Sequence, residues 1–149
     1  MPIKQTWPHM ETLSGDAAQF KREVLQTFQL YTQAFQALDA GAVARHFHEP
    51  AFFIAPGDVR PLPTTAAVEQ AYAKVMADMP PDYARTEFGP ISAHRLGDDL
   101  AMVSGAGTWK NAANEDLRSF GMTFTLRRTG QTWRIVVVAI HAPDGGIGR

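Results

Sequence analysis

The chain has 149 residues, no cysteine and a formal net charge of −1 at pH 7. A chain of this length forms one domain and buries about 68–70% of its unfolded surface, so the fold needs no disulfide or metal staple. The lack of cysteine excludes a thiol nucleophile and a cysteine-based zinc site, and the balanced charge gives no electrostatic reason to expect nucleic acid or a membrane as partner.

Residues 1–15 contain two prolines and are predicted to be an extension that precedes the domain. They lack the apolar run of ~7–15 residues that a signal peptide needs, and no segment of the chain approaches the ~18 apolar residues of a membrane span. We therefore expect a soluble, cytoplasmic protein.

From Asp16 onward, apolar residues recur at steps of four and three, which is typical of one face of an α-helix. These residues are Phe20, Val24, Phe28, Tyr31, Phe35 and Leu38. The spacing predicts a helix of about six turns with an aromatic inner stripe. Asp16 and Gln19 approximate a capping box at its start, and Gly41 is expected to stop it.

A short second helix is predicted over residues 42–48, before Glu49 and Pro50. The segment "AFFIAPG" then indicates a short buried strand that ends at Pro56 and Gly57. A third helix begins near Thr64 or Thr65 as N-cap and ends before two prolines at 80–81. Its periodic apolar residues are Val68, Ala71, Tyr72, Val75, Met76 and Met79.

The rest of the chain has β character, with strands predicted over residues 83–96, 100–110, 117–128 and 132–142. The loops between them are short enough for consecutive antiparallel hairpins. No strand–helix–strand repeat builds a parallel sheet, so we predict an α+β fold in which a curved antiparallel sheet wraps around the long helix. The domain is expected to span residues 16–143, followed by a flexible tail over 144–149.

The last strand ends on a histidine after a mostly apolar run. Strict alternation places Trp133, Ile135, Val137, Ala139 and His141 on one face. The other face then carries Arg134, Val136, Val138 and Ile140. This alternation continues the row of Trp133 and Ile135 to His141, whose ring at the strand end can hydrogen-bond a backbone carbonyl. It also predicts that Val136, Val138 and Ile140 form an outer apolar row through which the protein makes a homodimer.

The element order, together with "YTQAFQALDAGAVARHFHEPAFFIAPG" and "GQTWRIVVVAIH", resembles the nuclear transport factor 2-like superfamily over residues 16–143. That superfamily includes SnoaL-like polyketide cyclases, ketosteroid isomerases and limonene epoxide hydrolases. The resemblance implies a cone, in which a curved sheet wraps helices around an apolar pocket, in most members as a homodimer.

Within this resemblance, Tyr31 matches a tyrosine found in some ketosteroid isomerases, eight residues before Asp39. The family's general base, a carboxylate directly before a proline in the first strand, corresponds here to Ala55. An alanine methyl cannot abstract a proton, which argues against the isomerase reaction. The pattern of two aspartates and an arginine of the epoxide hydrolases is not visible either.

The resemblance brings the helix stripe and the last strand together around the pocket. The predicted ligand-binding residues are Tyr31, Phe28, Phe35, Phe52, Trp109, Met122, Phe124 and His141. Tyr31 and His141 are the expected polar handles, since imidazole accepts or donates a proton near neutral pH. The candidate catalytic residues are His141 and Asp58, which lies shortly after Ala55. The inward or outward direction of Glu87 stays open, because Gly89 and Pro90 follow it.

His46, His48 and His94 do not have the i, i+4 spacing of a helical zinc pair, and no HExxH motif occurs. We expect neither a metal nor another cofactor. Three functions remain open: binding of a small apolar molecule, acid/base catalysis on a carbonyl compound, and a dimeric scaffold for a protein partner. A cavity of roughly 300 Å³ or more with converging polar groups favours the first two over the scaffold.

Overall fold

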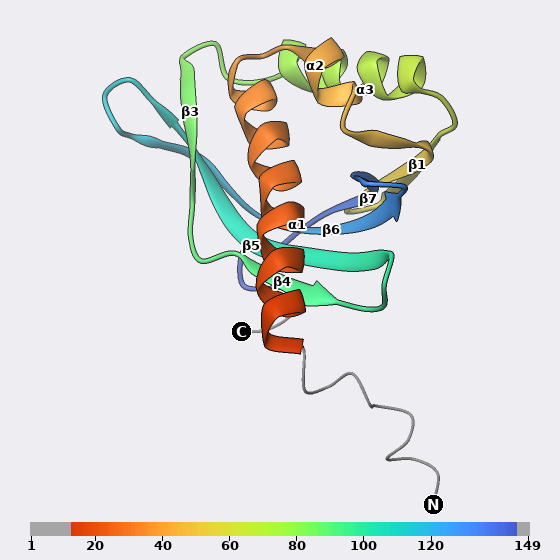
Figure 1. Cartoon of the computed structure of the whole chain (residues 1–149). Helices are drawn as coiled ribbons and strands as arrows, with labels where there is room; N and C mark the ends of the chain where they lie inside the picture. The colour runs from red at the N-terminus through yellow and green to blue at the C-terminus, as the bar shows by residue number, and fades with distance from the viewer. Residues whose placement is uncertain (1–12, 146–149) are drawn as a thin grey trace, which may run out of the picture.

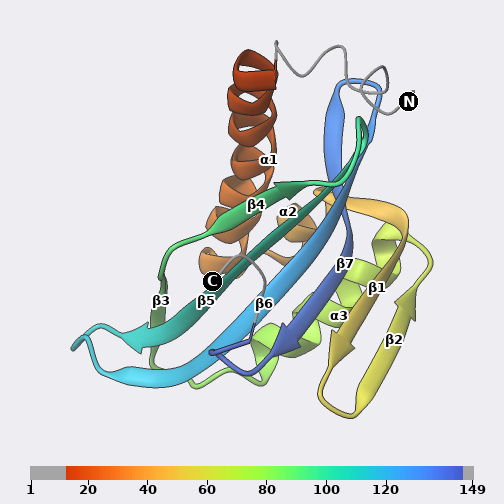
Figure 2. The same cartoon turned by 90° about the horizontal axis from the view of Figure 1, so that it is seen from below.

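A computed structural model describes residues 13–145, and its helices lie on one side of a curved sheet (Figure 1, Figure 2). The helices are α1 (Leu13–Gln36), α2 (Ala40–Ala44) and α3 (Thr65–Ala77). The strands are β1 (Phe47–Ala55), β2 (Asp58–Leu62), β3 (Tyr83–Phe88), β4 (Ser92–Arg95), β5 (Leu100–Asn111), β6 (Asp116–Thr129) and β7 (Thr132–His141). Most of the predicted extension and tail lies outside the described residues.

The long helix α1 crosses the sheet and buries the predicted stripe from Phe20 to Tyr31. It begins at Leu13, so Asp16 lies within its first turn and is not the N-cap. It stops earlier than predicted, because Leu38 adopts a left-handed φ of 58°. The amides of Leu38 and Asp39 bond the carbonyls of Phe35 and Ala34, which is the pattern of a Schellman C-cap. Leu38 is therefore exposed and does not continue the stripe.

The second helix differs from the prediction at both ends. The Asp39 side chain accepts a hydrogen bond from the Ala42 amide at 3.0 Å and caps α2, so Gly41 lies inside this helix and is not a stop. His46 and His48 lie beyond α2, and His48 is part of β1. The third helix agrees with the prediction: Thr64 is its N-cap and accepts from the Ala67 amide at 3.1 Å.

The strands form one sheet in the order β2-β1-β7-β6-β5-β3, with β4 paired to β5. The strand pairs are antiparallel, except that β1 runs parallel to β7. The prediction of a purely antiparallel sheet is wrong at this pair. The chain leaves the sheet after β2, passes through α3, builds β3 to β6, and returns beside β1 (Figure 2).

Two further strand predictions need correction. The predicted strand over residues 83–96 is two strands. The Gly89 amide still donates to the Ala106 carbonyl, but Pro90 has no amide proton, and the pairing with β5 resumes at Ser92. After β1, Gly57 takes a positive φ of 78° and turns the chain into β2, an edge strand absent from the prediction. β1 begins at Phe47, earlier than predicted, and several of its residues are exposed although it pairs with β2 and β7.

A β-bulge in β7 overturns the predicted alternation of the last strand. Thr125 pairs with Val137 and Leu126 pairs with Ile135, so Val136 has no partner in β6. The extra residue shifts every later side chain to the opposite face. Val138 is consequently fully buried and Ile140 packs against the core, so the predicted outer row of Val136, Val138 and Ile140 is wrong.

Candidate functional site

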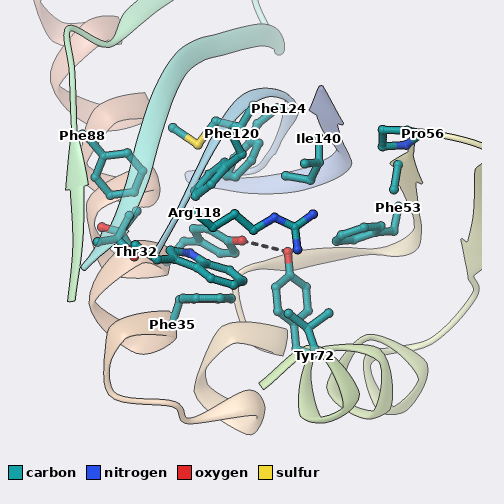
Figure 3. Close-up of a pocket in the computed structure, with 16 residues that line it drawn as sticks. Thr32, Phe35, Phe53, Pro56, Tyr72, Phe88, Arg118, Phe120, Phe124 and Ile140 are labelled. Carbon is teal, nitrogen blue, oxygen red and sulfur yellow. Dashed lines mark hydrogen bonds between the residues drawn. The ribbon is translucent and has the colours of Figure 1, made fainter. Parts of the chain in front are cut away.

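A cavity of about 230 Å³ lies between α1, α3 and the inner face of the sheet (Figure 3). Tyrosine, phenylalanine and aliphatic side chains make up most of its wall. The lining residues are Tyr31, Thr32, Phe35, Phe53, Ala55, Pro56, Tyr72, Val75, Thr86, Phe88, Trp109, Arg118, Phe120, Met122, Phe124 and Ile140.

Local backbone geometry places these side chains. Tyr31 and Phe35 are one helical turn apart on α1, and Phe35 stacks on Trp109 with ring centroids 6.2 Å apart. Along β6, alternate residues face the cavity: Arg118, Phe120, Met122 and Phe124. The β7 bulge adds Ile140 to the same wall.

The deepest polar feature is a pair of buried tyrosines, one from α1 and one from α3. The hydroxyls of Tyr31 and Tyr72 are 2.8 Å apart and hydrogen-bonded (Figure 3). Burial raises the pKa of Tyr31 and raises the pKa of Tyr72 well above its ordinary value, so both hydroxyls keep their protons at neutral pH. The two hydroxyls carry two protons. One proton forms the hydrogen bond between them, and no described residue accepts the second.

Three more polar residues border the cavity, and the Thr32 hydroxyl among them donates to the Gln29 carbonyl at 2.9 Å. The Thr86 hydroxyl bonds the Tyr83 hydroxyl at 2.8 Å. Arg118 extends across the cavity, with its guanidinium directed toward Phe53, Ile140 and Tyr72 in Figure 3. Its guanidinium carbon is also 5.8 Å from the centre of the Trp109 ring, which is cation–π distance.

Five of the predicted ligand-binding residues lie in the cavity wall: Tyr31, Phe35, Trp109, Met122 and Phe124. Their role in binding stays a prediction. Phe28 is buried behind the wall, in contact with the rings of Tyr31, Phe88 and Phe124. Phe52 is 39% exposed, because its neighbour Phe53 is the residue of β1 that faces the cavity.

The structure places His141 on the outer face of the sheet, so the prediction that it borders the cavity is wrong. Its Nε2 lies 2.9 Å from the Thr123 hydroxyl, and Thr123 faces away from its cavity-lining neighbours Met122 and Phe124. Its Nδ1 lies 2.9 Å from the carbonyl of Ala142, so Nδ1 carries the proton and Nε2 accepts. The β7 bulge is the cause of this reversal.

The described wall contains no aspartate, glutamate or histidine. Ala55, which the resemblance to ketosteroid isomerases aligns with their general base, borders the cavity together with Pro56. Asp58 is exposed at the start of β2, where it pairs with Arg60 at 3.1 Å. Glu87 is exposed and pairs with Arg85 at 3.0 Å, which answers the open question of its direction.

Sequence reasoning missed several wall residues, most importantly Tyr72 and Arg118. Tyr72 was counted among the apolar residues of α3. Its hydroxyl could have indicated a polar group facing the interior. Arg118 continues the alternating row of Phe120 and Met122, so strand parity alone could have assigned it to the inner face.

The described residues contain no group of three or more histidine or acidic side chains arranged to hold a metal ion. His48 Nδ1 lies 2.9 Å from the carbonyl of Pro50, and His94 Nε2 is buried without a hydrogen-bond partner. Among the described helices, none combines the length and the hydropathy needed to cross a bilayer.

Comparison with known proteins places the chain in a family. A family model described as NTF2-like protein (DUF6841) matches residues 22–143. None of the curated proteins matches the chain.

Several solved structures share the fold. Aln2 from a Streptomyces species is 21% identical, with 85% of this chain and 92% of that chain covered and a TM-score of 0.71. An NTF2-like protein of unknown function from Pseudomonas putida is 16% identical, with 87% and 91% covered and a TM-score of 0.70. An NTF2-like protein with a cystatin-like fold from Novosphingobium aromaticivorans is 18% identical, with 95% and 94% covered and a TM-score of 0.66. At these identities the likeness concerns the fold, and with the match over residues 22–143 the chain belongs to the NTF2-like family.

Proposed function

We propose that this protein binds a small ring-containing molecule in the cone cavity. The observation that carries the proposal is an apolar, aromatic cavity that holds a buried hydroxyl pair, Tyr31 and Tyr72, with one proton to donate. Aromatic walls bind flat apolar molecules, and a few placed polar groups fix their orientation. A ligand oxygen that accepts a hydrogen bond from the second hydroxyl proton would give both tyrosines a full set of hydrogen bonds.

The cavity size supports a small ligand. Its volume of about 230 Å³ is smaller than the roughly 300 Å³ expected from the sequence for a binding site, and it leaves room for a molecule below drug size. We therefore propose a ligand of one or two rings.

The chemistry of the wall favours binding over acid/base catalysis. Proton abstraction needs a base in reach of the substrate, and the described wall contains neither a carboxylate nor an imidazole. Tyr31 and Tyr72 have a raised pKa, so they donate hydrogen bonds and do not serve as bases at neutral pH.

Calorimetric titration with 2-naphthamide, a neutral two-ring amide, tests the proposal. We expect binding to the wild type and its loss in Val75→Phe, which fills the cavity with a larger side chain. Val59→Phe is the matched control, because Val59 is 64% exposed on the edge strand β2 and outside the cavity. Equal binding to Val75→Phe and wild type, or no binding to any of the three proteins, contradicts the proposal.

We also propose that the outer sheet face forms a homodimer, through other residues than those predicted. Phe52 and Ile54 of β1 and Val59 of β2 are exposed there, and Phe52 and Ile54 pair with Val137 and Ala139 of β7. A contiguous apolar patch of this kind is unfavourable in water. In sedimentation, we expect Phe52→Glu to convert a dimer to a monomer, and Leu30→Glu on exposed α1 surface to leave the dimer intact.

A further inference from the structure

We infer that the molecule bound in the cavity carries a carboxylate, which lies against Arg118. The inference rests on the proposed function and names the chemical class of the ligand.

Arg118 differs from the other cations near this end of the sheet in having no acidic partner. Lys110 lies 2.7 Å from Asp116, and Arg85 lies 3.0 Å from Glu87. Arg118 makes no ion pair with any described carboxylate, and the contact found for it is with the Trp109 ring. A guanidinium left without an anion at a cavity wall is available to a ligand.

Arg118 borders the cavity and is at the same time exposed to solvent. Its strand neighbours on the inner row, Phe120 and Met122, line the same wall, so the side chain starts on the cavity side of β6. The Trp109 contact, with the guanidinium carbon 5.8 Å from the ring centre, is a cation–π contact and uses none of the N–H donors of Arg118 in a hydrogen bond.

The electrostatics of the wall select for an anion. Arg118 is the one residue of the described wall with a formal charge at neutral pH. Arg118 itself is exposed, so its attraction to an anion is screened by solvent, and the apolar ring contacts of the cavity wall add to it. A carboxylate matches the planar donor geometry of arginine and can accept two parallel hydrogen bonds. The ring body of the ligand then occupies the aromatic part of the cavity.

A pair of isosteric probes tests this inference: 2-naphthoate, which is ionised at pH 7, and neutral 2-naphthamide. We expect the wild type to bind 2-naphthoate about tenfold more tightly than 2-naphthamide, since charge-assisted hydrogen bonds are stronger than neutral ones. The preference should shrink as salt is added, because salt screens a partly exposed charge.

The variants localise the effect. Arg118→Gln should weaken 2-naphthoate binding about tenfold more than it weakens 2-naphthamide binding, so that the preference for the carboxylate is lost. Arg118→Lys keeps the charge but loses the bidentate geometry, and should fall between wild type and Arg118→Gln. Arg127→Gln is the matched control: it removes one positive charge from the same strand, at a side chain that lies outside the cavity wall and pairs with Asp99.

Failure of the inference is distinct from failure of the proposed function. If the wild type binds both probes equally, or if Arg118→Gln and Arg118→Lys keep the full preference for 2-naphthoate, the carboxylate assignment is wrong although the cavity binds. If neither probe binds the wild type, both proposals are wrong. Should Arg118→Gln fail to fold, the wild-type preference, its salt dependence and Arg118→Lys still decide the question.

Discussion

The aromatic stripe of α1 meets two different environments along its length. At the end that includes Val24, side chains pack against strand residues such as Leu126 and Ile135 that are fully buried. At the end that includes Phe35, rings of similar character stack on Trp109 and border a cavity. Residues at one helical spacing therefore belong both to a closed core and to a cavity wall, and the two ends differ in what these side chains face.

The largest expected effect is at the closed end. Leu126→Ala removes a fully buried side chain that does not line the cavity, and should lower the free energy of unfolding by about 2–5 kcal/mol. Phe120→Ala, at the open end, should cost less stability, because its ring is half-buried, but should weaken 2-naphthamide binding. Urea unfolding and calorimetry measure the two quantities. Equal stability losses with unchanged binding would show that the two ends do not differ.

A smaller effect is expected where the two ends meet, at the tyrosine pair. Tyr72→Phe leaves the buried Tyr31 hydroxyl without its partner, which should cost about 1–3 kcal/mol in unfolding free energy. The double variant Tyr31→Phe with Tyr72→Phe should be less destabilised than the sum of the single variants, since it leaves no unpaired hydroxyl. Strict additivity in this double-mutant cycle contradicts the pairing.

The same pair predicts how stability depends on alkaline pH. The chain has three tyrosines, and burial raises the pKa of Tyr31, Tyr72 and Tyr83 in the folded state. Folding therefore favours the neutral phenols: this contribution is fully present below the ordinary pKa of about 10 and declines as pH rises above it. In an alkaline titration, tyrosinate absorbance should appear together with the loss of native circular dichroism. Reversible ionisation of all three phenols near pH ~10 with an intact fold would contradict this.

The smallest expected effect on ligand binding is that of His141→Ala. The imidazole lies on the outer face with Thr123 and the Ala142 carbonyl, outside both the core and the cavity wall. Its loss should leave 2-naphthamide affinity unchanged and lower the unfolding free energy by about 1 kcal/mol, the usual worth of such a hydrogen bond. A strong loss of affinity in a normally folded His141→Ala protein would show that the outer face communicates with the cavity.

The sequence predicts those parts of the molecule in which polar and apolar residues alternate at the spacing of a helix or a strand. The α1 stripe, the N-cap of α3 and the inner row of β6 belong to this group, and they supply Tyr31, Met122 and Phe124 to the cavity wall. The α+β class follows from the order of these elements, and the resemblance to the family rests on that order together with particular sequence segments.

The parts that could not be predicted have no local pattern of polar and apolar residues that distinguishes one arrangement from another. In β7, Val136, Val137 and Val138 are equally apolar, so nothing in their order reveals which residue is the extra one in the bulge. The parallel pairing of β1 with β7 joins distant segments, and no local pattern encodes it. The role of Tyr72 depends on Tyr31 lying opposite it, which is a tertiary contact.

The position of β7 in the sheet also has a consequence for the order in which the chain folds. β1 lies between β2 and β7, and β7 is the last strand of the described chain. A two-stranded hairpin is marginally stable by itself, so β1 and β2 have little to hold them until residues 132–141 have been synthesised. Pairing of distant segments is slow, because the chain loses loop-closure entropy before the contacts form. During synthesis, the ribosome must therefore release nearly the whole domain before the sheet can close, and the cavity is expected to be among the last features to form.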